Sequence, residues 1–141
     1  MIEVAYLFNE ADLPRLLSTT PGRERIFFVS KELADTDSML AGVMRYTEDA
    51  ASPYHLHENC EHFYLIFEGQ GTFESEEGTI DLNPGDLVFI PPEEKHRLSA
   101  KTPLFYFELQ APNRFKTKIL DAGSEADLLW NRVDGKVWVQ S

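Results

Sequence analysis

Four histidines are the residues of this sequence best suited to chemistry: His55, His57, His62 and His96. Three of them lie close together in the segment HLHENCEH. Residues two positions apart on a strand point to the same face, so His55 and His57 can direct their imidazoles at one point. Imidazole is the commonest metal-ligating side chain near neutral pH, because it is basic and still largely uncharged. The pattern predicts a metal site.

Short strands must position these histidines. Segments rich in aromatic and β-branched residues recur between turn markers, at 26–29, 40–47, 62–67, 71–74, 78–82, 87–90 and 104–109. This spacing predicts an antiparallel barrel or sandwich. We expect helix only near the ends, at 12–17 and from Ser124 through Trp130, followed by a last strand at 136–140.

Alternation along the strand that starts at His62 separates two apolar faces. His62, Tyr64 and Ile66 share one face, which we expect to line the barrel interior. Phe63 and its alternate neighbours share the other face, which we expect to pack on a second sheet. The four residues between His57 and His62 allow a turn that returns this strand beside the first histidines.

Length and charge narrow the class of protein. A chain of 141 residues predicts one domain with a real core. Its net charge of −11 disfavours nucleic acid and membrane surfaces as partners. No apolar run approaches the length of a membrane span. One cysteine, Cys60, and an opening MIEVAYLFNEAD without an export signal lead us to expect a cytoplasmic protein.

Two segments resemble the motifs of the cupin superfamily. His55-x-His57, a four-residue gap, His62 and then Gly69 after six residues resemble the first motif. Gly85, Pro91 and His96 follow the spacing of the second motif. The resemblance covers about residues 40–110 of a single domain spanning 1–141. It implies an all-β antiparallel double-stranded β-helix, a divalent metal on the four histidine positions, and a homodimer that pairs through its terminal strands.

The sequence departs from the family pattern at four positions. Asp49 and Glu93 replace glycines, and Ala100 replaces an asparagine. His62 stands where the family usually has a glutamate, so we expect an all-histidine site of His55, His57, His62 and His96. Glu61 is the alternative ligand if a one-residue bulge shifts the turn.

Four neutral ligands leave the full charge on a divalent ion, which makes it a stronger Lewis acid than one held by a carboxylate. Nitrogen-rich sites suit Mn, Fe, Co, Ni, Cu or Zn. We therefore expect a metal-dependent enzyme that acts on a small organic molecule. A dioxygenase is the first hypothesis for its reaction. An isomerase or lyase is the alternative enzyme, and a non-catalytic ligand-binding module is the alternative outside enzymes.

The rest of the pocket is expected to be aromatic. Tyr64 and Tyr46 are the residues able to donate a hydrogen bond to a reacting oxygen. Further pocket candidates are Phe105 and Phe107, and the candidates for holding a substrate carboxylate are Arg45, Arg97 and Arg114. Strand alternation sends Arg97 away from the pocket, because it follows His96 directly.

Overall fold

The computed structural model describes residues 5–113, 116–121, 129–132 and 137–139. Nearly all regular structure is β-strand. The elements are η1 (Glu10–Asp12), β1 (Leu16–Ser18), β2 (Arg23–Val29), α1 (Lys31–Ala34), β3 (Leu40–Tyr46), β4 (His55–Glu58), β5 (Glu61–Glu68), β6 (Gly71–Ser75), β7 (Gly78–Leu82), β8 (Leu87–Ile90), β9 (Arg97–Ala100), β10 (Leu104–Ala111), β11 (Lys116–Ile119), β12 (Leu129–Arg132) and β13 (Val137–Val139).

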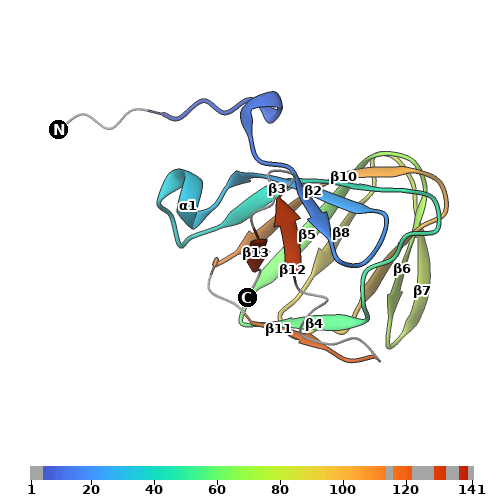
Figure 1. Ribbon diagram of the computed structural model, residues 1–141. Helices are drawn as coiled ribbons and strands as arrows, with labels where there is room; N and C mark the ends of the chain where they lie inside the picture. Colours follow the sequence, from blue (N-terminus) through green and yellow to red (C-terminus); the bar gives the residue numbers. More distant parts are fainter. Residues whose placement is uncertain (1–4, 114–115, 122–128, 133–136, 140–141) are drawn as a thin grey trace.

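The strands form one large sheet and two small ones. The large sheet has the order β13-β12-β1-β2-β3-β10-β5-β8, and the small sheets are β11-β4 and β7-β6-β9. Two backbone hydrogen bonds between His55 and His96, of 2.9 and 2.8 Å, join β4 to the start of β9. Figure 1 shows the β11-β4 pair along the bottom of the view and β6 with β7 at the right. The expected all-β architecture is confirmed.

The core lies on the inward face of the large sheet. Along β10, burial alternates residue by residue, so that Leu104, Tyr106, Glu108 and Gln110 point inward. Antiparallel pairing places Gln110 opposite His62 on β5. The same alternation that fills the core therefore carries polar side chains to one part of it.

The other side of β5, β8 and β10 forms an outer apolar face. Phe67, Leu87 and Phe89 are 45, 53 and 54% exposed there. This face consists of Phe63, Leu65, Phe67, Leu87, Phe89, Phe105, Phe107 and Leu109. We expected the Phe63 side of the strand to pack on a second sheet and Phe105 with Phe107 to line the pocket. Both expectations are wrong, because the inward positions of β10 are those of Tyr106 and its alternate neighbours.

The helix predictions at the ends also need correction. The first turn is a 3₁₀ turn at Glu10–Asp12, capped by Asn9, and the chain is already extended at Leu16. Leu16 is 2% exposed because β1 pairs with both β2 and β12. Most of the expected C-terminal helix lies outside the described residues, but Leu129 and Trp130 belong to a strand. Within the described residues, no helix is long and apolar enough to cross a membrane.

Candidate metal centre

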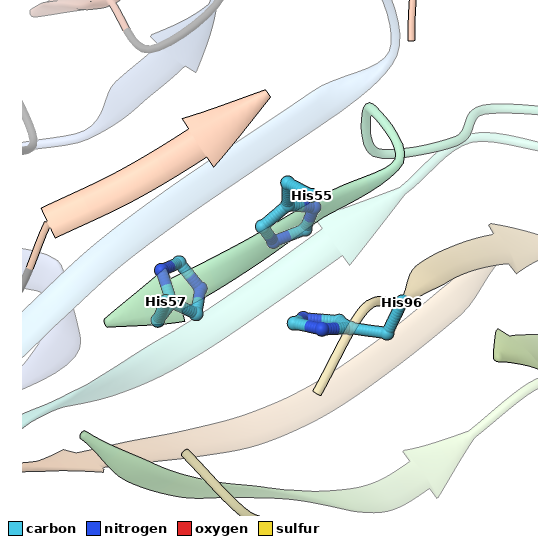
Figure 2. A group of neighbouring side chains, drawn as sticks. All are labelled: His55, His57 and His96. Atoms are coloured by element: carbon cyan, nitrogen blue, oxygen red, sulfur yellow. The ribbon is translucent and has the colours of Figure 1, made fainter. Parts of the chain in front are cut away.

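Three histidines face one another across the small sheets. His55 and His57 are both buried, because alternate positions of β4 share a face. His96 precedes β9 and is held opposite His55 by the paired backbone bonds. Figure 2 shows the rings of His55 and His57 carried by one strand and the ring of His96 reaching toward them. One ligand atom from each of the three lies within 4.8 Å of the others.

His62 brings a fourth ring to the group. Its Nε2 lies 3.3 Å from Nε2 of His96, and its ring centroid lies 4.8 Å from that of His57. The His62 side chain is 2% exposed, whereas the neighbouring Glu61 is exposed and pairs with Ala111 at the end of β10. No register shift separates Glu61 from His62 in the pairing with β10, so the carboxylate points away from the histidines.

Hydrogen bonds fix the direction of two lone pairs. Nδ1 of His55 lies 2.6 Å from the carbonyl oxygen of Pro53, and Nδ1 of His96 lies 2.8 Å from that of Glu94. A carbonyl oxygen only accepts, so each Nδ1 must carry the proton and donate it. Each Nε2 then presents a lone pair to the centre of the group. Such carbonyl partners are the usual orienting contacts of metal-bound histidines, so these residues fit a metal ion.

The other two rings have different surroundings. Nδ1 of His57 lies 2.8 Å from the hydroxyl of Thr117, which faces His57 across the β11-β4 pair. Nε2 of His57 lies 3.3 Å from the side-chain nitrogen of Gln110. Nδ1 of His62 is buried and has no hydrogen-bond partner in the described part of the chain.

Burial keeps the four imidazoles neutral. It is the largest cause that lowers the pKa of each ring. Neighbouring positive charge lowers the pKa values of His55, His57 and His62 further. The pKa of His62 falls to about 2 and that of His96 to about 4. The pKa values of His55 and His57 also lie well below 6.5. Near neutral pH the site therefore offers uncharged nitrogen donors, which is the form that binds a metal.

A small cavity lies beside the histidines. Its volume is about 30 Å³, and its walls include His55, His57, Tyr64, Glu108, Arg23 and Arg25. That volume holds one or two water molecules. The Tyr64 hydroxyl lies 3.4 Å from Nε2 of His96, and burial, followed by the charge of Glu108, raises the tyrosine pKa well above 10. Tyr64 is therefore a protonated hydroxyl at the edge of the site.

Tyr46 lies farther from the histidines than expected. Its hydroxyl is 3.3 Å from that of Tyr106, and its ring packs beneath the guanidinium of Arg23. Tyr46 lines a separate, open groove of about 610 Å³, together with Leu104 and Phe105. Among the two tyrosines singled out from the sequence, Tyr64 is thus the one that lines the histidine cavity.

The arginines singled out from the sequence lie elsewhere. Arg45 pairs with Glu10 at 2.6 Å, and Arg97 pairs with Asp121 and Glu74. Arg114 lies outside the described residues.

Charged residues that the sequence analysis missed line the cavity instead. Arg25 and Glu108 form a buried ion pair at 3.0 Å, and both side chains are about 95% buried. Arg23 occupies the same face of β2, two positions before Arg25. Trp130 packs against both guanidinium groups, at 5.0 and 4.6 Å from ring centroid to Cζ. Strand alternation could have identified these arginines, because Arg25 and Arg23 lie two and four positions before Phe27 and so share the face of that buried residue.

Cys60 takes no part in this chemistry as a nucleophile. Its side chain is 1% exposed, and burial, followed by the charges of Glu108 and Glu61, raises the pKa of the thiol to about 12. A thiol with that pKa carries almost no thiolate near neutral pH.

Comparisons with known proteins agree with this architecture. Residues 42–109 match the family model described as Cupin domain, and the sequence has no significant match among curated proteins. A sugar phosphate isomerase of the cupin superfamily from Silicibacter pomeroyi superposes with a TM-score of 0.72 at 14% identity, covering 96% of this chain and 93% of that one. The polyketide cyclase RemF from Streptomyces resistomycificus also gives 0.72, at 18% identity, over 86 and 89% of the two chains.

A third solved structure is similar over a smaller share of its own length. Salicylate 1,2-dioxygenase from Pseudaminobacter salicylatoxidans gives a TM-score of 0.64 at 20% identity, over 72% of this chain and 31% of that one. At these identities the likeness concerns the fold, and the proteins themselves have different named activities. Residues 42–109 thus match the Cupin domain model, the fold is that of the cupin structures, and the buried histidines form a candidate metal site.

Proposed function

We propose that this protein is a metal-dependent enzyme that acts on a small organic molecule. Its cofactor would be one divalent transition metal, Mn, Fe, Co, Ni, Cu or Zn, held by His55, His57, His62 and His96. The observations that carry the proposal are the buried group of His55, His57 and His96, the Nε2 of His62 that lies 3.3 Å from that of His96, and the adjoining cavity lined by His55, His57, Tyr64 and Glu108. Inward imidazoles without a ligand would leave several lone pairs facing one another at a cost in stability.

The polypeptide supplies orientation and proton control around this centre. Carbonyl groups of Pro53 and Glu94 hold two of the rings in the tautomer that presents Nε2. The Tyr64 hydroxyl, protonated by virtue of its raised pKa, donates to a substrate oxygen that enters the cavity. When bound, the metal supplies Lewis-acid polarisation and, if it is redox-active, electron transfer.

A dioxygenase is the first reaction class we propose. Four nitrogen ligands suit Fe, Cu, Mn, Co and Ni, and a redox-active ion held by these histidines would supply the one-electron chemistry that O₂ activation needs. The fold that this chain shares with salicylate 1,2-dioxygenase supports the same class. The proposal requires that substrate turnover consumes O₂ and that both depend on the metal.

A non-redox isomerase or lyase is the second candidate, and Glu108 is the observation that favours it. Its carboxylate lines the same cavity as Tyr64, so the site contains a proton acceptor as well as a proton donor. The structural neighbours named as a sugar phosphate isomerase and a polyketide cyclase support this class. Turnover at an unchanged rate without O₂ would select it over the dioxygenase.

The decisive experiment begins with elemental analysis of protein purified without a polyhistidine tag. We expect close to one transition metal per chain in the wild type and a large loss in His57→Ala. Oxygen uptake is then screened over small diketones, phenols and hydroxy acids, with His57→Ala as the inactive control. Metal bound without turnover of any substrate would favour a ligand-binding module. Folded protein that takes up no metal would contradict the proposed function.

A further inference from the structure

Arg23 is a buried cation that forms no ion pair with any carboxylate among the described residues. Its side chain lies on the inward face of β2, and the residue is 9% exposed. Nη1 lies 3.3 Å from the Ser18 hydroxyl, but Nε is buried and has no hydrogen-bond partner among the described residues. The guanidinium packs against the rings of Tyr46 and Trp130, at 5.3 and 5.0 Å.

The other arginines show that this arrangement is unusual in the protein. Among the arginine side chains that the structure describes, Arg15, Arg25, Arg45 and Arg97 each form an ion pair with a carboxylate. Arg23 forms none within the described residues, although it is as deeply placed as Arg25. A guanidinium stays charged in proteins, and an uncompensated buried charge is costly. An anion from outside the chain would compensate this buried charge.

The position of Arg23 shows where that anion binds. Arg23 lines both the small cavity and the open groove of about 610 Å³ beside Tyr46. On the cavity side it stands with His55, His57 and Tyr64, so its charge faces the candidate metal centre there. Glu108, the acid in the same cavity, is held by Arg25 at 3.0 Å. Filling the metal centre would add further positive charge, because its histidine ligands are neutral. The cavity therefore favours a negatively charged guest.

We propose that Arg23 binds the carboxylate of the substrate, and that the substrate is a small hydroxy or keto acid whose adjacent oxygen faces the histidines. This assignment deepens the proposed function and rests on it. The planar fork of a guanidinium matches a carboxylate, and the flanking aromatic rings hold that fork in place. A cavity of about 30 Å³ disfavours a bulky phosphorylated acid beside the histidines.

Glycolate and its uncharged amide, glycolamide, test the proposal as matched probes. Their affinities are measured by calorimetry on the metal-loaded wild type, and the metal content of each sample is determined in parallel. We expect glycolate to bind roughly tenfold or more tightly than glycolamide, as a charge-assisted hydrogen bond to Arg23 implies. In Arg23→Met the preference for glycolate should fall roughly tenfold or more, to the part that the metal alone provides, while metal content stays at the wild-type level.

Control variants separate this role from a structural one. Arg15→Met removes an exposed guanidinium from the neighbouring β1–β2 region and should leave the preference for glycolate intact. Arg23→Lys keeps the charge without the fork and should retain a reduced preference, which keeps the test available if Arg23→Met fails to fold. A full preference for glycolate in folded Arg23→Met, or none in the wild type, would overturn the proposal.

Two further measurements distinguish the possible failures. If the wild type takes up no metal, the proposed function fails. The affinities of glycolate and glycolamide for the metal-free wild type and Arg23→Met then still test whether Arg23 binds a carboxylate. Tighter binding of inorganic phosphate than of glycolate would overturn the assignment to a carboxylate.

Discussion

The Nε2 atoms of His62 and His96 lie 3.3 Å apart, although the residues belong to different motifs of the sequence. Because Nδ1 of His96 donates to a carbonyl oxygen, Nε2 of His96 presents a lone pair to its neighbour. Two facing ring nitrogens are stabilised by a shared proton or by a cation between them. This pair is the reason for including His62 in the proposed ligand set.

Replacing His62 and Glu61 separately tests that ligand set. We expect His62→Ala to lower the affinity for metal by at least roughly tenfold, because it removes a buried nitrogen donor. Glu61→Ala should change it little, because that side chain is exposed and points away. Metal content after dialysis against a weak chelator provides the measurement. Loss of metal from the glutamate variant alone would show that the ligand assignment is wrong.

Thr117 gives a test of ring orientation at His57. The hydroxyl lies 2.8 Å from Nδ1 of His57, so Thr117→Val removes this contact while keeping a similar shape. Loss of such an outer contact typically lowers metal affinity roughly 10–100-fold. Thr79→Val on β7, an exposed position, is the matched control. Titration with a competing chelator measures both, and equal affinities in the two variants would contradict the orienting role.

The outer apolar face predicts how two copies associate. The sequence led us to expect a homodimer joined by terminal strands, and that surface stays a prediction. The structure adds a second surface, because Phe89 and Leu87 expose more than half of their surface on the outer apolar face, and contiguous patches of this kind usually mark interfaces. We therefore predict a homodimer that buries this face.

Light scattering at micromolar concentration measures that association. Phe89→Glu should convert the dimer to monomer, because it places a charge in the apolar contact. Ile80→Glu on β7 is the control, since Ile80 is 52% exposed but lies in another sheet. A monomeric wild type, or a dimer unaffected by Phe89→Glu, would argue against this surface.

Gly42 provides a test of the packing between β2 and β3. A Cβ added at this position would lie 2.2 Å from the carbonyl oxygen of Ile26, which is backbone and cannot rotate away. We expect Gly42→Ala to lower the free energy of unfolding by about 2–3 kcal/mol through overpacking. Gly85→Ala meets no atom within 4 Å and carries only the strain of its φ of +91°, about 1–2 kcal/mol. Urea unfolding compares them, and an equal or smaller loss in Gly42→Ala would contradict the packing argument.

The strands rich in aromatic and β-branched residues between turn markers were predictable from the sequence. Those at 78–82 and 87–90 have the expected bounds, and the expected strand at 40–47 corresponds to Leu40–Tyr46. The short strands β1, β9, β11 and β12 were not predicted, because these segments lack a clear run of aromatic and β-branched residues between turn markers. Lys116–Ile119, for example, alternates exposed and half-buried residues and pairs with the histidine-bearing β4.

The histidine cluster was also predictable. Strand alternation places His55 and His57 on one face, and the spacing of the second motif adds His96 to them. The buried charges were not predictable. Arg23, Arg25 and Glu108 occupy inward positions that hydrophobic patterning assigns to apolar residues.

Asp49 and Glu93, which replace family glycines, both adopt positive φ of 67°. The backbone shape of these turns is therefore kept without the residue that adopts it most readily.

Trp130 on β12 packs against both Arg23 and Arg25, far outside the segment 42–109 that matches the family. Thr117 and Arg23 lie outside that segment as well. A fragment trimmed to the matched segment would keep every histidine of the cluster, with Pro53 and Glu94, and still lose Thr117, Arg23 and Trp130. The smallest unit able to perform the proposed reaction therefore includes strands on both sides of the recognisable motif.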